Sequence, residues 1–268
     1  LVAAALPPVE VKDSPAAEEL SSLFTMVSQF LSHCKSVEQF TVATECLDIL
    51  FRQHPRCVDQ FDVDGLLTAI SLCLSRYGPH ISPTHASTIY IRLCRLVGVA
   101  IGSYRQRVGD RHHLILPILK RLLNCVLDWS KKQGRAQEKD KNQPYWAAPL
   151  QASDGADFTR LLASLSDPTL SSVARPNARE GLTDKTKKAK RITSQYLQYF
   201  VMEYARMCLE GIFPPEIKAA IIPGLYSILD GLSTDAMRSL NAELDVSSRA
   251  VFKGLYDDYV KFGKWNKA

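Results

Sequence analysis

Apolar side chains recur three or four residues apart along most of the chain, which is the spacing that puts them on one face of an α-helix. The first half carries five such stripes, over 20–30, 37–51, 63–77, 89–101 and 115–129. Proline or glycine separates several of them, as at Gly78 and Pro79. No segment alternates apolar and polar residues between turn signals in the way that predicts a strand. The pattern therefore predicts an all-α fold.

The turns between the stripes are short, and two helix starts are marked. Pro15 follows a serine that can cap the helix, because proline suits the first helical position. Ser36 and Gln39 have the spacing of a capping box, in which each side chain satisfies a backbone N–H. Successive antiparallel helices of this kind predict an irregular helical-repeat array that is α-solenoid-like, as in HEAT or armadillo proteins. No repeat of fixed period is present.

The composition changes between residues 131 and 190. This segment is polar and basic, and its residues predict a loop-rich insertion rather than continuous helix. Pro144, Tyr145 and Trp146 form a possible small anchor within it, and 157–165 predicts one short helix. A long helix is expected to begin near Ala189 and to end at Gly211.

The last fifty residues predict two further amphipathic helices. Apolar residues of 217–232 share one face, and the following stripe is formed by Val251, Leu255, Tyr259 and Phe262, widened by Phe252, Tyr256 and Val260. We expect Gly263 to end that helix in a left-handed conformation. Trp265 is then expected to fold back on the helical core as a C-terminal anchor. We thus predict a single all-α domain over 1–268, with helical pairs in 1–130, the insertion in 131–190 and a C-terminal helical cap in 191–268.

The composition is that of a folded protein, with 46% hydrophobic residues and a formal net charge of +5. A mildly basic balance is compatible with an RNA-rich environment but does not establish one. The seven cysteines are irregularly spaced and include no C-x-x-C pair, which predicts reduced thiols in a nuclear or cytosolic protein. No uncharged run predicts a membrane span. A chain that starts at Leu1 is expected to be part of a longer protein.

The sequence offers no pattern for bond chemistry. His112 and His113 are adjacent, so their side chains diverge on a helix, and no histidine has a metal-ligating partner at helical spacing. Phosphate-binding and nucleophile-elbow motifs are absent from the sequence. We therefore predict no catalytic residue, no metal site, no cofactor and no small-molecule substrate. A hydrolase whose site is spread over loops is the least supported alternative.

The densest charge cluster consists of Lys185, Lys187, Lys188, Lys190 and Arg191. Lysine and arginine bind RNA phosphates, so these five residues are candidate RNA-binding residues. The same residues are also compatible with a nuclear-targeting signal, or with a solvated loop at the entry to a helix. A cationic helix start also opposes the helix dipole, which leaves the cluster without an obvious role in folding.

Four aromatic residues follow the cluster, namely Tyr196, Tyr199, Phe200 and Tyr204. They have the residue types of stacking platforms for RNA bases. Their helical spacing, however, favours packing in the core.

Three segments carry a resemblance to a known family. They read SQYLQYFVMEYARMCLEG, PGLYSILDGLS and RSLNAELDVSSRAVFKGLYDDYVKFGKWNKA. These segments resemble the carboxyl end of the nucleolar family of unhealthy ribosome biogenesis protein two, also called nucleolar pre-ribosomal-associated protein two. The resemblance is specific over about 195–268 and looser before that. It concerns a whole segment, so it carries over no active-site residue.

The resemblance implies a role for the chain. It would be the C-terminal domain of a nucleolar assembly factor in early large-subunit (pre-60S) particles, supporting pre-rRNA processing without catalysis. Its implied partners are other helical scaffold proteins, an RNA helicase and pre-rRNA, bound directly or through those proteins. A generic helical-repeat adaptor that binds only proteins is the main alternative.

Overall fold

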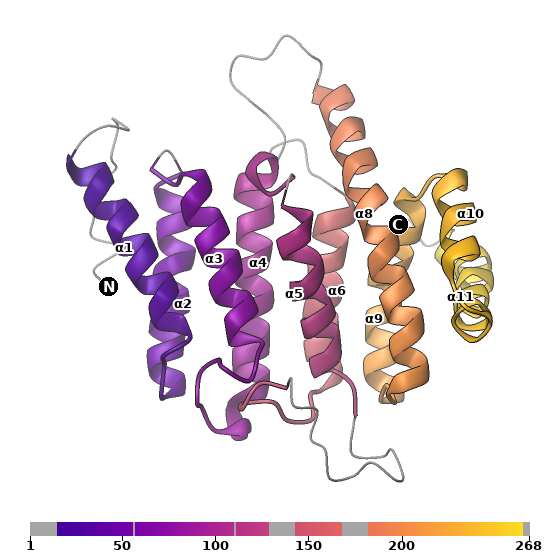
Figure 1. Cartoon of the computed structure of the whole chain (residues 1–268), viewed down its shortest axis with the longest axis horizontal. Coiled ribbons are helices and arrows are strands. Elements are labelled where there is room, and N and C mark those ends of the chain that lie inside the picture. Colours follow the sequence, from indigo (N-terminus) through magenta and orange to yellow (C-terminus); the bar gives the residue numbers. More distant parts are fainter. Residues whose placement is uncertain (1–14, 56, 110, 129–142, 168–181, 265–268) are drawn as a thin grey trace. The chain divides into compact units, whose positions relative to one another are not determined.

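The computed structural model describes residues 15–55, 57–109, 111–128, 143–167 and 182–264. These residues form ten α-helices and two short helical turns (Figure 1). The described residues contain no strand. They do contain an isolated antiparallel β-bridge between Asp128 and Ile212. The all-α prediction is confirmed.

The chain divides into two compact units. Unit 1 comprises Leu1–Arg121 with Asp140–Ala148, and unit 2 comprises Leu122–Lys139 with Pro149–Ala268. The division falls inside one helix, α5 (His112–Cys125). The single domain over 1–268 stays a prediction, and each unit is described by itself.

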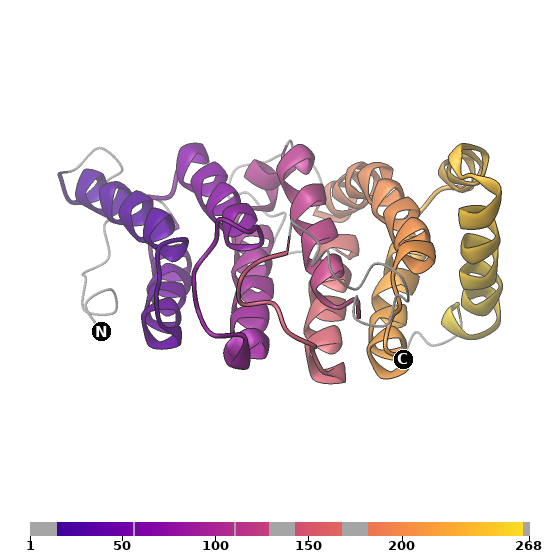
Figure 2. The ribbon, with the colours of Figure 1, turned by 60° about the horizontal axis from the view of Figure 1, so that its bottom comes forward.

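Unit 1 is a two-layered helical assembly. It contains α1 (Pro15–Leu31), α2 (Val37–Gln53), α3 (Gln60–Cys73), η2 (Pro83–His85), α4 (Ala86–Val108) and the first part of α5. Helix α1 packs on α2 and α3, and α4 packs on the same two helices from the other layer. The two views show α1 and α3 in one layer and α2 and α4 in the other (Figures 1 and 2).

Aromatic rings fix the centre of unit 1. Phe51 of α2 makes edge contacts with Phe24 of α1 and Tyr104 of α4, at centroid distances of 5.0 and 5.4 Å. The Tyr104 hydroxyl also donates to the Phe51 carbonyl oxygen at 2.6 Å. Trp146 is fully buried, and its indole N–H donates to the Cys73 carbonyl oxygen at 3.0 Å. The predicted small anchor is therefore confirmed.

Helix α4 and the turn before it are apolar enough for a membrane span by length and composition, over Pro83–Val108. The sequence predicted no span. Ile89, Leu93 and Val97 of this helix have no exposed area. Packing against α2 and α3 accounts for its hydrophobicity, as expected of a core helix.

Unit 2 is built around one close helix pair. It contains α6 (Ala152–Ser166), α8 (Leu182–Glu210), α9 (Pro215–Gly231), α10 (Thr234–Glu243), α11 (Val246–Asp258) and η3 (Tyr259–Gly263). Helices α6 and α9 approach closely at Gly224, which has no side chain. A Cβ there would lie only 3.0 Å from Thr159 Cα. The Thr159 hydroxyl donates to the Ala220 carbonyl oxygen at 2.6 Å. Helix α8 packs on both of these helices and on α10 and α11.

Two predicted details of helix geometry are wrong. The long helix α8 begins at Leu182, well before Ala189, so the basic cluster lies within a helix instead of in a loop before it. At the start of α2, Ser36 accepts from the Gln39 N–H as predicted, but the Gln39 side chain accepts from the Lys35 N–H. The reciprocal capping box occurs instead on α3, between Asp59 and Asp62.

The end of the last helix also differs from the prediction. Tyr259–Gly263 is a π-helical turn, closed by the Lys264 N–H donating to the Tyr259 carbonyl oxygen at 2.9 Å. The wider turn shifts the register by one residue, so Gly263 faces the core and Phe262 is 60% exposed. Leu255, Tyr259 and Phe252 are buried as predicted, whereas Tyr256 and Val260 are more than a third exposed.

Gly263 is required for close packing and not for a left-handed conformation. Its φ lies outside the left-handed region, contrary to the prediction. A Cβ there would lie 2.7 Å from ring carbons of both Tyr226 and Tyr259. Trp265, the predicted anchor, lies outside the described residues.

Candidate nucleic-acid interface

The basic half of α8 is the strongest candidate site for a polyanion. From Lys185 to Met202 the chain contains five basic residues and no acidic residue. Because α8 begins at Leu182, a helical backbone carries all five. With a rise of about 1.5 Å per residue, the cluster spans roughly 9 Å of helix. The side chains of Lys185, Lys187 and Lys188 lie outside the described residues.

Lys190 points into unit 2. Its ammonium lies 3.4 Å from Asp167 Oδ1, just after α6, and 3.7 Å from Asp230 Oδ2 near the end of α9. Its side chain is about one third exposed, at 32%. These two ion pairs connect α8 to the ends of α6 and α9. Lys190 is thus a candidate residue whose charge is matched within the fold.

Asp230 connects Lys190 to the C-terminal turn. Its Oδ1 accepts a hydrogen bond from the Tyr259 hydroxyl at 3.1 Å, and the Tyr259 ring packs on Tyr226 at 5.6 Å. Burial, and secondarily the nearby Asp230 carboxylate, raises the pKa of Tyr259 to about 12. The phenol therefore keeps its proton at neutral pH and remains a donor. We call Lys190, Asp230, Tyr259 and Gly263 the C-terminal node.

Arg191 is exposed, unlike Lys190. It shares a helical face with Gln195 and Tyr199, at i, i+4 and i+8, and all three are exposed. Tyr199 is 48% exposed and Tyr196, next to this face, is 38% exposed. We call Arg191, Gln195, Tyr196 and Tyr199 the α8 strip.

The four aromatic residues predicted to pack in the core divide into two pairs. Phe200 and Tyr204 are buried, and their rings pack on Phe158 and Phe213. Tyr196 and Tyr199 are exposed, so the prediction is wrong for them. Tyr199 lies one position before Phe200 and so about 100° away from it around the helix. Tyr196 lies four positions before Phe200, at the edge of the face that Phe200 and Tyr204 define.

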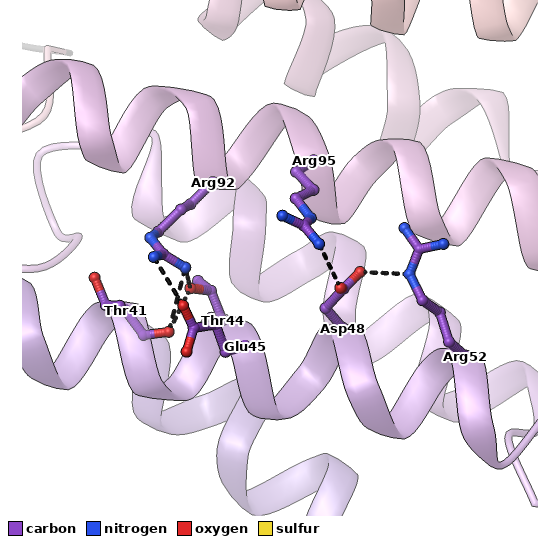
Figure 3. Close-up of polar contacts among 7 residues, drawn as sticks. All are labelled: Thr41, Thr44, Glu45, Asp48, Arg52, Arg92 and Arg95. Carbon is purple, nitrogen blue, oxygen red and sulfur yellow. Dashed lines mark hydrogen bonds and ion pairs between the residues drawn. The ribbon is translucent and has the colours of Figure 1, made fainter. Parts of the chain in front are cut away.

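A second set of basic side chains lies on the α2–α4 surface of unit 1, and the sequence reasoning did not identify it. Figure 3 shows three arginines reaching acidic or polar groups of α2. Arg92 donates to Glu45 Oε1 at 3.0 Å, to the Thr44 hydroxyl at 3.2 Å and to the Thr41 carbonyl oxygen at 3.5 Å. The arginine ladder is our name for three arginines and the groups of α2 that they contact: Arg52, Arg92 and Arg95 with Thr41, Thr44, Glu45 and Asp48.

The remaining ladder contacts meet at one carboxylate. Asp48 accepts from Arg95 at 3.0 Å and from Arg52 at 2.8 Å (Figure 3). Its side chain is only 13% exposed. The i, i+4 spacing of Asp48 and Arg52 was visible in the sequence, whereas the pairs with α4 join residues about 47 apart.

The described residues give little support to bond chemistry. Among them, no group of three His, Cys, Asp or Glu side chains is placed to hold a metal ion. A pocket of about 580 Å³ lies at the starts of α6 and α9, lined by Gln151, Ser153, Glu216 and mostly apolar or proline residues. All seven cysteines are free. Burial raises the pKa of the Cys34 thiol to about 11 and that of Cys125 to about 12, so both are poor nucleophiles at neutral pH.

Comparison with known proteins adds three findings. A sequence profile of the Urb2/Npa2 family matches residues 41–268, a wider range than the 195–268 segment of specific resemblance. The chain is similar to the probable nucleolar pre-ribosomal-associated protein 2 of Schizosaccharomyces pombe (strain 972 / ATCC 24843), with 18% identity over 211 residues. The match covers 79% of this chain and 16% of that protein. No solved structure matches the chain.

Proposed function

Since the chain belongs to the Urb2/Npa2 family, we propose that it is a non-catalytic domain of an assembly factor for the large ribosomal subunit. Membership of this family implies a role in ribosome biogenesis, and the fission-yeast relative is named as nucleolar and pre-ribosome-associated. In this proposal the domain acts in the nucleolus, as a scaffold in early pre-60S particles. Its partners are helical scaffold proteins, an RNA helicase and pre-rRNA.

The observation that carries the RNA part of the proposal is the basic half of α8. Eighteen successive residues from Lys185 to Met202 include five basic residues and no acidic residue. In the described residues, the fold supplies acidic partners to Lys190 and leaves Arg191 exposed. Phosphate groups of pre-rRNA have the charge and the acceptor oxygens to occupy such a surface.

The proposed architecture is an irregular helical-repeat array. Its support is the packing within unit 1, where α1–α2 and α3–α4 are successive pairs and corresponding helices of the pairs pack on each other. This is the neighbour-to-neighbour packing from which helical repeats are built. Such arrays provide extended surfaces for several partners at once.

A protein-only adaptor is the second candidate, and exposed apolar groups at the C-terminal end favour it. Val246 is 81% exposed and Phe262 is 60% exposed. Apolar groups of this kind are used more often in protein interfaces than in contacts with phosphates.

A purification from nucleolar extract separates the two candidates. The tagged chain is recovered before and after ribonuclease treatment, and the bound RNA and proteins are identified. A variant with Lys185, Lys187, Lys188 and Arg191 changed to glutamine is recovered in parallel, with Lys190 retained. We expect the wild-type chain to recover large-subunit precursor RNA with assembly proteins, and the variant to lose most of that RNA. Recovery of the same proteins with no precursor RNA, in both chains, would support the protein-only adaptor and contradict the RNA contact.

A further inference from the structure

The exposed tyrosines of α8 follow the exposed Arg191 along the helix. Arg191, Gln195 and Tyr199 follow one helical face, and Tyr196 borders it. From Arg191 to Tyr199 the face is roughly 12 Å long. The strip thus combines one cation with two exposed aromatic rings.

These rings are separate from the aromatic packing that holds α8 in place. Phe200 and Tyr204 are each 2% exposed, and they are the aromatic residues through which α8 packs on Phe158 and Phe213. Tyr199 is 48% exposed and Tyr196 is 38% exposed. Each of these two residues therefore has an exposed part that a ligand can reach, and Tyr196 also interacts within the fold.

We infer that the α8 strip binds single-stranded RNA, with bases stacking on Tyr199 and Tyr196 and with a phosphate bound by Arg191. This inference rests on the proposed RNA contact and specifies its chemistry. Aromatic side chains next to a positively charged track are the combination by which proteins bind single strands without reading their sequence. A duplex hides the faces of its bases inside the helix, so it would use the cations but not the rings.

The charge of this part of α8 favours RNA over a protein ligand of mixed charge. No acidic residue occurs in the sequence between Asp184 and Glu203, so this stretch itself supplies no partner for basic groups of a ligand. A nucleic acid strand carries one negative charge for each nucleotide. It also supplies flat bases that can stack on the exposed tyrosine rings.

Binding of fluorescently labelled RNA to the 268-residue chain tests this inference. The probes are a 20-nucleotide oligouridine and a 20-base-pair RNA duplex, which differ in base accessibility. The variants are Tyr199→Leu, Tyr196→Leu and the double change, with Tyr→Phe changes that retain the ring. Tyr77→Leu is the matched control, because Tyr77 is also an exposed tyrosine beside an arginine, Arg76, but lies in unit 1.

We expect the double leucine variant to bind oligouridine about 10–100-fold more weakly, since base stacking on an aromatic residue is lost twice. Its affinity for the duplex should change less than threefold, because the base faces of a duplex are not accessible to the tyrosine rings. The slope of affinity against salt concentration should stay the same because tyrosine carries no charge. The phenylalanine variants and Tyr77→Leu should bind as the wild-type chain does.

The outcomes separate this inference from the proposed function. If the leucine variants bind oligouridine as tightly as the wild-type chain while the glutamine variant of the basic cluster does not, stacking is contradicted and the phosphate contact stands. If the wild-type chain binds neither probe, both the stacking and the RNA contact are contradicted. If the leucine variants lose the single strand and the duplex equally, the tyrosines do not distinguish single strands and the inference is overturned.

Discussion

Basic side chains lie on the surface of both units, but they have different partners. On the α2–α4 surface of unit 1, each arginine of the ladder has an acidic partner within 3.0 Å (Figure 3). On α8 of unit 2, Lys190 is paired with two aspartates and Arg191 is exposed beside two exposed tyrosines. Arg92 and Arg95 of the ladder join α4 to α2, whereas Arg191 of the α8 strip is exposed.

The comparison teaches that the density of positive charge does not identify a binding surface by itself. Matched charges contribute to the fold and attract a polyanion weakly, because their carboxylate neighbours cancel the local potential. Unmatched charges contribute little to the fold and retain that potential. The difference predicts opposite effects of equivalent mutations, on stability in one region and on RNA affinity in the other.

The largest expected effect on stability is that of Gly263→Ala in the C-terminal node. The new methyl group would overlap the rings of Tyr226 and Tyr259, and overpacking of this kind costs about 1–3 kcal/mol. Tyr259 would then move away from Asp230, the partner of Lys190. Urea unfolding measures the loss.

Gly254→Ala is the matched control for this change. Gly254 lies in α11, the helix that directly precedes η3, and a Cβ there meets nothing within 4 Å. Alanine at an unstrained helical position should leave the stability unchanged or raise it by up to about 1 kcal/mol. Equal losses at the two positions would contradict the packing role of Gly263.

The next largest effect is that of Arg92→Met in the arginine ladder. Methionine retains the apolar stem but leaves Thr41, Thr44 and Glu45 without their donor. Loss of these hydrogen bonds should cost about 1–2 kcal/mol of unfolding free energy. RNA affinity should not change, which binding at low salt would verify.

Arg95→Met provides the comparison within the ladder. Arg95 is 64% exposed, and its ion-pair partner among the described residues is Asp48, so its removal should cost less than about 1 kcal/mol. A loss of RNA affinity in either variant would break the distinction between the two surfaces.

The smallest effects concern neighbouring residues of α8. Lys190→Met removes two partly exposed ion pairs and should cost about 0.5–1 kcal/mol, with little change in RNA affinity. Arg191→Met should leave the stability within about 0.5 kcal/mol of wild type and should weaken RNA binding. Thermal unfolding measures the stability of both variants, and RNA titration measures their RNA affinity. Identical behaviour of the two variants would show that the cluster is not divided as described.

The sequence predicted those features that depend on local spacing. The helical stripes and the Ser36 cap follow from residues within a few positions of each other, and the structure confirms them. The family resemblance was also carried by contiguous segments. The five candidate RNA-binding residues stay a prediction, now with Lys190 distinguished from Arg191 by its contacts.

Features that depend on distant residues or on a change of helical period could not be predicted in this way. Lys190 and Asp230 are joined by tertiary packing, and so are Arg92 and Glu45. The π-helical turn shifts Phe262 outward and Gly263 inward, which a constant period of 3.6 residues does not anticipate. The exposure of Tyr199 likewise depends on which face of α8 its neighbours cover.

The most direct test of the central claim is the salt dependence of RNA binding by two variants, each lacking three basic residues. In the α8 variant, Lys185, Lys188 and Arg191 are changed to glutamine, and in the ladder variant Arg52, Arg92 and Arg95 are changed to glutamine. Both lose the same formal charge, so a general effect of net charge would weaken binding equally. Oligouridine affinity is measured over a series of salt concentrations, together with the melting temperature of each variant.

We predict that the log–log slope of affinity against salt falls by about 2 in the α8 variant, at roughly 0.7 for each lost phosphate contact, with its melting temperature retained. The ladder variant should keep the wild-type slope and melt earlier, by about 2–4 °C for each kcal/mol of stability lost. Equal slopes in the two variants, or a reduced slope in the ladder variant alone, would contradict the assignment of RNA binding to α8.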